Sequence, residues 1–76
     1  MTYTQANEKA KELTLMARRA GALDSNENYI VYANMYVKQL CIKKRFGGAY
    51  VVQDFKTFND LYTYILDKMD DIRCMY

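Results

Sequence analysis

A chain of 76 residues is sized for a single domain, and we expect residues 1–76 to fold as one unit. Hydrophobic residues make up 51% of it and eight residues are tyrosines, which is too apolar for a disordered segment. The net charge of +2 is too small to indicate a nucleic-acid-binding protein by itself, and the absence of histidine removes the most common general base and metal ligand.

The N-terminus shows no apolar leader, and no apolar run reaches membrane-spanning length. We therefore expect a cytoplasmic protein without membrane contact. Cys41 and Cys74 are expected to be reduced and to act as small apolar side chains, with a disulfide between them as the alternative. Their spacing matches no zinc or redox motif and no histidine is present to activate them, so we expect no catalytic, cofactor or metal site.

The first element is predicted to be a helix that begins after Thr2. Gln5 follows three residues later and completes a capping box, and Gly21 is placed for a left-handed C-terminal cap. Between these limits, apolar residues recur at spacings of three and four and form one stripe: Ala6, Ala10, Leu13, Ala17 and Ala20.

The segment 25–38 carries two conflicting signals. The run Tyr29-Ile30-Val31-Tyr32 consists of strand-forming residues. The two alternating sets of residues that a strand would present are about equally apolar, however, whereas the helical period places seven apolar residues on one face. Periodicity favours a second helix at about 25–38 and propensity favours a strand; we expect the helix and keep the strand as the alternative. The residues on the helical face are Tyr29, Ile30, Ala33, Tyr36, Val37, Leu40 and Cys41.

A β-hairpin is predicted around Gly47-Gly48, with strands 39–46 and 49–54. Two glycines between strand-forming runs are typical of a type I′ turn, which needs a positive φ at both central residues.

The last element is predicted to be a helix over 57–73. Thr57 and Asp60 have the spacing of a capping box, and a helical stripe of apolar residues follows. The chain is therefore expected to be an α+β domain. The stripe consists of Phe58, Leu61, Tyr62, Ile65, Met69, Ile72 and Tyr76, and its C-terminal part offers a homodimer seam as an alternative to the core.

Two basic groups are candidate nucleic-acid contacts. Lys43, Lys44 and Arg45 lead into the hairpin tip beside aromatic residues, an arrangement that can contact phosphates and stack bases. The alternative is a charged tip that protects a sheet edge from pairing. Arg18 and Arg19 end the first helix, where the helix dipole alone accounts for them.

Three acidic residues in the last two turns of the C-terminal helix are disfavoured by their surroundings: Asp67, Asp70 and Asp71. Acids near a helix C-terminus oppose the dipole and repel one another at spacings of three and four. The alternatives are a solvated face, a contact surface for a basic partner and a weak Mg²⁺ or Ca²⁺ site; three carboxylates without a ligand-rich loop make a poor cation cage.

The run from Gly47-Gly48 through Asp54-Phe55 into the capped helix resembles the C-terminal half of small phage-encoded proteins, including some anti-CRISPR inhibitors. The resemblance is architectural and covers about 38 residues. It implies a non-enzymatic phage or mobile-element protein that binds and sterically inhibits a host defence complex, such as a nucleoprotein. We expect its contacts to come from the acidic residues and from exposed tyrosines at Tyr50, Tyr62 and Tyr64. The alternative is a small nucleic-acid-binding accessory protein that uses the basic groups.

Overall fold

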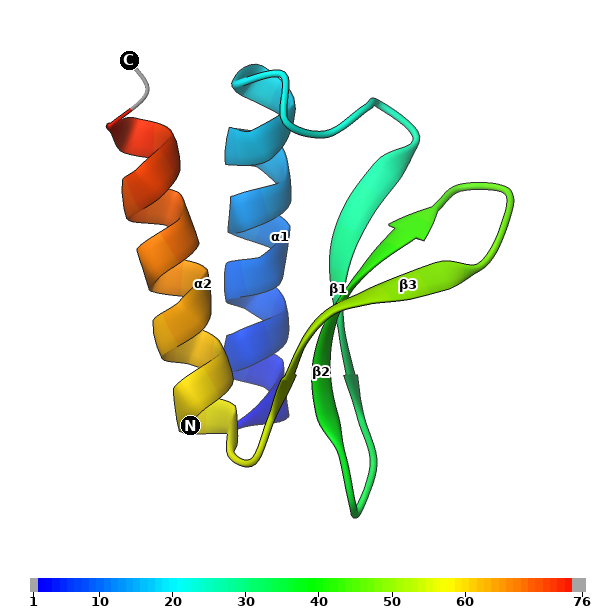
Figure 1. Cartoon of the computed structure of the whole chain (residues 1–76), viewed down its shortest axis with the longest axis vertical. Helices are drawn as coiled ribbons and strands as arrows, with labels where there is room; N and C mark the ends of the chain where they lie inside the picture. Colours follow the sequence, from blue (N-terminus) through cyan, green and yellow to red (C-terminus); the bar gives the residue numbers. More distant parts are fainter. Residues whose placement is uncertain (1, 75–76) are drawn as a thin grey trace.

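The protein is an α+β domain in which two helices cover one face of a three-stranded antiparallel sheet (Figure 1). The computed structural model describes residues 2–74, and the strand order in the sheet is β1-β2-β3. In chain order the elements are α1 (Tyr3–Arg19), β1 (Glu27–Ala33), β2 (Lys38–Lys44), β3 (Ala49–Phe55) and α2 (Phe58–Arg73).

The first and last predicted helices are confirmed, and each has its predicted N-cap residue; the reciprocal half of the capping box is recorded for α1 but not for α2. Thr2 accepts a hydrogen bond from the Gln5 N–H and the Gln5 side chain accepts one from the Thr2 N–H, which completes the capping box of α1. Gly21 follows the helix with φ 78°, a left-handed conformation that suits glycine. At the start of α2, Thr57 accepts a hydrogen bond from the Asp60 N–H. The predicted end of the apolar stripe at Tyr76 lies outside the described residues.

The expected helix at 25–38 is wrong, and the strand alternative is the one that the structure adopts. Residues Glu27–Ala33 form β1, and a tight turn leads into β2. Asn34 explains the turn: its side chain accepts hydrogen bonds from the Tyr36 and Val37 N–H groups at 2.8 and 2.9 Å. An asparagine that closes a turn in this way interrupts the helical period, and the apolar residues before it are then divided between the two faces of a strand.

The predicted hairpin at Gly47-Gly48 is confirmed, but its type I′ turn is wrong. The strands end at Lys44 and resume at Ala49, so four residues connect them. Gly47 has a φ of 151° and Gly48 does not have a positive φ. The Arg45 N–H donates to the Asn26 carbonyl at 2.7 Å, and the Arg45 guanidinium lies over the Phe46 ring. The bond to Asn26 holds Arg45 beside the start of β1, and the pairing of β2 with β3 ends before the glycines.

A β-bulge in β3 brings Val52 toward the core. Cys41 pairs with Val51, whereas the preceding residue Leu40 pairs with Gln53, which leaves Val52 as the additional residue on β3. Val52 is partly buried and packs against the core. The largest fully buried side chains come from both layers: Leu13, Leu40, Leu61, Ile65 and Met69.

Side chains of α1 hydrogen-bond to the outer edge of β1. Thr14 Oγ1 donates to the Ala10 carbonyl at 2.8 Å and accepts from the Tyr29 N–H at 2.9 Å. The Arg18 guanidinium donates to the Glu27 carbonyl, and the Tyr3 hydroxyl donates to the Val31 carbonyl. Backbone groups that a second strand would normally occupy are therefore bonded within the domain.

Replacing Thr14 with valine should destabilise the domain by about 1–3 kcal/mol, because the buried Tyr29 N–H loses its acceptor while the side-chain volume is kept. Thr14→Ser is the matched control: it retains the hydroxyl and should cost less. Urea unfolding followed by circular dichroism measures both, and equal losses for the two variants would contradict the prediction.

Candidate protein-binding surface

A row of side chains crosses the helix-facing side of the sheet and becomes exposed at β3. In this row Ile42 of the central strand pairs with Tyr29 on one side and Tyr50 on the other. Tyr29 and Ile42 are buried, whereas Tyr50 is 51% exposed. Neither helix thus covers the β3 end of the row completely, and part of a tyrosine ring faces solvent there.

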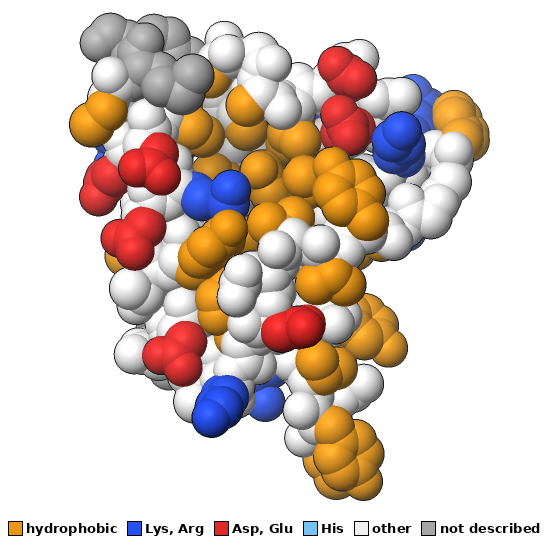
Figure 2. Space-filling view, viewed as in Figure 1, with side chains coloured by type: hydrophobic (Ala, Val, Ile, Leu, Met, Phe, Trp, Pro, Cys, Tyr) orange, Lys and Arg blue, Asp and Glu red, His pale blue; other side chains and the backbone are white. Residues whose placement is uncertain are grey.

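Helix α2 adds a second tyrosine and a lysine beside this exposed end. The Tyr64 ring packs against Phe55 with centroids 5.2 Å apart, and Lys68 Nζ lies 5.4 Å from the centre of the Tyr64 ring. We call Tyr29, Tyr50, Tyr64 and Lys68 the tyrosine surface. Figure 2 shows hydrophobic side chains gathered in the middle of this face, between α2 and the sheet.

The pKa of the Tyr29 hydroxyl is shifted by its place in this row. Burial raises the pKa of Tyr29 above its ordinary value, the positive charge of Lys68 lowers it, and Tyr64 and Tyr50 raise it further. Burial is the largest of these effects, so Tyr29 remains a neutral hydrogen-bonding group over the physiological pH range.

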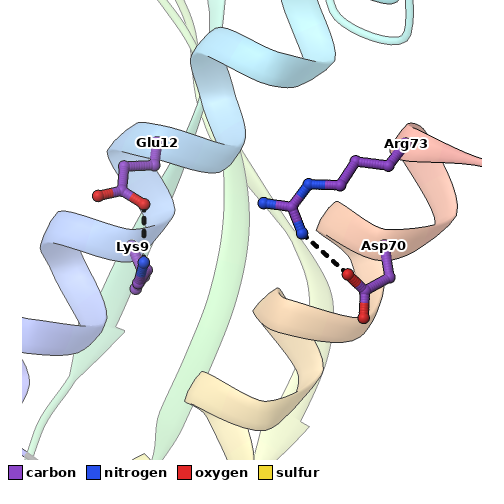
Figure 3. A network of polar contacts seen from close by, with 4 residues as sticks. All are labelled: Lys9, Glu12, Asp70 and Arg73. Atoms are coloured by element: carbon purple, nitrogen blue, oxygen red, sulfur yellow. Dashed lines mark hydrogen bonds and ion pairs between the residues drawn. The ribbon is translucent and has the colours of Figure 1, made fainter. Parts of the chain in front are cut away.

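The three predicted acidic residues are all exposed on α2, but they do not act as one group. Asp70 forms an ion pair with Arg73 at 2.9 Å (Figure 3). Lys9 and Glu12 form a pair with the same spacing of three residues on α1. A helical turn of 100° per residue places Asp67 and Asp71 on the side of α2 that carries Tyr64, and Asp70 on the side that carries Arg73. Acidic side chains follow α2 beside the hydrophobic patch in Figure 2.

The structure therefore brings Asp67 and Asp71 to the tyrosine surface and separates Asp70 from it. Within residues 2–74, no group of three or more Cys, Asp or Glu side chains is arranged to hold a metal ion.

Of the three tyrosines expected to be exposed, only Tyr50 is; Tyr62 and Tyr64 are half-buried, on different sides of α2. Tyr50 and Tyr64 belong to the tyrosine surface, whereas Tyr62 faces α1. There it lines a recess of about 120 Å³ together with Gln5, Glu8, Lys9 and Glu12. The stripe that offered a homodimer seam is largely used inside the fold: Ile65, Met69 and Ile72 are buried in the core.

The predicted basic residues meet at one corner of the molecule, where acidic residues also lie. Lys43, Lys44 and Arg45 are exposed, and Lys44 pairs with Glu27 across the sheet. Arg18 donates to the carbonyl of the same Glu27, and Arg19 is exposed on the same last turn of α1. Arg18 thus stabilises the fold directly, in addition to any contact with a partner.

Sequence reasoning missed two members of the tyrosine surface. Tyr29 was assigned to a helix, so its place in a strand beside Ile42 could not be foreseen. Lys68 is not among the residues that the sequence patterns single out. Its spacing of four residues from Tyr64 was the available signal, because residues at i and i+4 of a helix are neighbours.

The opposite face of the sheet carries a second apolar row that sequence reasoning also missed. Ile30, Cys41 and Val51 pair across the three strands on the side away from the helices. Cys41 is a free thiol that is only 4% exposed, and burial raises its pKa. Nearby, the β1–β2 turn presents Met35 and Tyr36, which are 83% and 90% exposed.

No protein-family model, curated protein or solved structure matches the chain. Within the described residues, neither helix has the length and apolar character needed to cross a membrane.

The free energy of unfolding should fall more steeply above about pH 10 in the native protein than in Tyr29→Phe. The folded-state pKa of Tyr29 is raised, so the unfolded state releases its proton first, and the stability held below the unfolded pKa is lost as pH rises through the folded pKa. Urea unfolding at pH 8, 10 and 11 measures the effect. Because both proteins share the remaining tyrosines and all lysines, identical pH slopes would show that Tyr29 does not titrate abnormally.

A thiol reagent should modify Cys74 quickly and Cys41 only after unfolding. Cys74 is exposed, whereas Cys41 is buried and its raised pKa reduces the thiolate fraction at neutral pH. The measurement is the number of thiols that react with Ellman's reagent at pH 8, with and without urea. Cys41→Ala and Cys74→Ala assign the two phases, and fast reaction of both thiols in the folded protein would contradict the burial of Cys41.

Proposed function

We propose that the chain is a non-enzymatic interaction protein that binds a basic surface of a host protein complex and blocks that complex sterically. The observation that carries the proposal is the half-exposed ring of Tyr50 at the same margin as Tyr64, which packs on Phe55. Helical geometry places Asp71 on the same side of α2 as Tyr64 and Asp67 further out on the exposed side. An exposed aromatic surface with a charged margin is the combination that protein–protein interfaces favour at their centre and rim.

The tyrosines provide the apolar part of this binding surface. Tyr50 is half exposed, and Tyr64 is held in place by Phe55, so little side-chain freedom is lost when a partner covers these rings. A tyrosine also presents both a ring and a hydroxyl, which allows apolar contact and hydrogen bonding at one position. The surface is therefore suited to a partner with apolar and polar groups side by side.

The two aspartates outnumber the single positive charge of Lys68 at this surface, and they indicate a basic partner. Asp67 and Asp71 repel each other at a spacing of four residues and lie near the end of a helix that disfavours negative charge. Positive charges on a partner would offset both effects. A protein surface that normally binds the phosphates of a nucleic acid carries such charges.

A host defence complex that handles nucleic acid is a partner of this kind. Its nucleic-acid-binding surface is basic, and a small protein that covers this surface inhibits without chemistry. The architectural resemblance of residues 47–61 to small phage-encoded inhibitors supports this choice. The proposed setting is the cytoplasm of an infected host cell, where such complexes act.

A small nucleic-acid-binding protein is the second candidate, and one observation favours it. Arg18 and Lys44 both lie beside Glu27, so basic residues distant in the sequence meet at one corner. The Glu27 and Asp24 carboxylates at the same corner reduce the positive field there, so we favour the protein-binding function.

Reversing the charges of Asp67 and Asp71 to lysine should abolish most of the inhibition while the domain stays folded. The assay is the plating of a phage on cells whose CRISPR–Cas system targets that phage, with and without expression of the chain. The native protein should restore plating, and Asp67→Lys with Asp71→Lys should reduce the rescue at least tenfold. Tyr50→Ala should also reduce it, since Tyr50 provides exposed ring surface.

Glu8→Lys with Glu12→Lys is the matched control, because it changes the net charge by the same amount at exposed sites of α1, away from the tyrosine surface and from the basic corner. Thermal unfolding checks that all variants are folded. Equal rescue by the two double variants would contradict the proposed surface. A salt-dependent shift of labelled DNA or RNA that is lost on reversing Lys43, Lys44 and Arg45 would favour the second candidate.

A further inference from the structure

The two outer edges of the sheet differ in how their backbone groups are satisfied. Three α1 side chains bond to the outer edge of β1, through the Glu27 carbonyl, the Tyr29 N–H and the Val31 carbonyl. Within residues 2–74, the corresponding contact on β3 is one long hydrogen bond of 3.5 Å, from the Gln53 side chain to the Asp54 carbonyl. The β3 edge is thus the open edge of the sheet.

The register identifies which β3 groups point outward. The Tyr29 N–H points to α1, so the backbone N–H and C=O groups of its neighbours Asn28 and Ile30 point to β2. The backbone groups of their partners Lys43 and Cys41 therefore point to β1. The direction of the N–H and C=O groups alternates along a strand, so those of Ile42 point to β3 and pair with those of Tyr50. The residues on either side of Tyr50 therefore direct their N–H and C=O groups away from the sheet: Ala49 and Val51.

This open edge adjoins the tyrosine surface. In Figure 1, β3 passes in front of the other two strands, and Figure 2 shows the hydrophobic patch of the same face between this edge and α2. An additional strand beside β3 would cover the patch. Alternate side chains of that strand would point toward Tyr50 and Tyr64 on the helix side, the side of α2 on which Lys68 and Asp71 also lie.

We infer that β3 is a docking edge for an extended segment of the partner, which pairs with Ala49 and Val51 as a fourth strand. The segment carries apolar side chains on the helix side, where they contact Tyr50 and Tyr64, and at least one Lys or Arg on that side for Asp67 or Asp71. This inference rests on the proposed function and specifies how the same surface recognises its partner.

The sequence of β3 and its bulge agree with a short, selective docking edge. Exposed edges are commonly protected by lysine or proline, and Ala49–Phe55 contains neither. The extra residue Val52 interrupts the regular alternation after Val51, so a straight partner strand can pair continuously only with the first part of β3. Backbone pairing is therefore limited, and side-chain contacts with the tyrosine surface must select the partner.

The test uses the whole chain and a synthetic nine-residue peptide, Thr-Lys-Thr-Val-Thr-Val-Thr-Lys-Thr, blocked at both ends. As a strand, this peptide presents two valines and two lysines on one face and threonines on the other. Amide hydrogen exchange by NMR is the readout. Saturating peptide should slow exchange of the Ala49 and Val51 N–H groups at least tenfold and leave the Tyr29 N–H, which Thr14 already accepts, unchanged.

Two peptide controls leave the protein unaltered. Replacing both lysines of the peptide with glutamate should weaken binding at least tenfold, and methylating the threonine backbone nitrogens on one edge should weaken it similarly. Two protein variants complete the set: Val51→Pro removes an outward N–H and should lose binding, whereas Val51→Thr keeps it and should bind. If Val51→Pro does not fold, the methylated peptide still decides the outcome.

Several results would overturn the docking edge: no binding at millimolar peptide, protection at other amides, or equal binding of the glutamate and methylated peptides. These results are independent of the phage assay. A protein that restores phage plating but does not bind the peptide would keep the proposed function and lose the strand-pairing mode. A protein that binds the peptide but does not restore plating would keep the edge and lose the proposed host target.

Discussion

The hydroxyl of Thr14 links the two layers of this domain at the outer edge of the sheet. It donates to the preceding turn of α1 and accepts from the backbone of β1, and the bonds from Arg18 and Tyr3 extend the same contact along the strand. A chain of this size buries a limited fraction of its surface, so few groups are available to stabilise the fold. The bonds from α1 stabilise the helix–sheet packing and also satisfy backbone groups at the edge of the sheet. The position of α1 over β1 follows from these bonds, and α2 then covers the central strand.

The exposure of Tyr50 follows from that asymmetric placement. Three alanines on the buried face of α1 let the helix lie close to its neighbours, but they add little width to the helix layer. The row from Tyr29 to Tyr50 therefore begins under the helices and ends in solvent. Tyr50 and Tyr64 lie at this margin, where each ring is partly buried against the core and partly open to solvent. The tyrosine surface is the margin of the core that the two helices leave partly uncovered.

Sequence reasoning identified the elements whose limits are set locally. Thr2 with Gln5, Gly21 and Thr57 act on their own neighbours, so their patterns located both helices and their ends. The segment 25–38 could not be assigned in this way, because strand pairing with β2 decides its conformation and the deciding turn depends on the single residue Asn34. The same error hid Tyr29 from the candidate site. Tyr50, Tyr64, Asp67 and Asp71 could be chosen as exposed contact residues, but their meeting on one surface depends on how α2 lies over the sheet.

The unequal edges of the sheet also set a limit on assembly. A sheet can grow through repeated strand pairing only when each added unit offers a second open edge. In this domain three outward groups of the β1 edge are bonded to α1, so a copy that pairs through β3 presents only this occupied edge to the next molecule. Growth beyond one addition, by a partner segment or a second copy, must first break these bonds. A protein with an unprotected strand can in this way remain free of fibre growth at high concentrations in the cell.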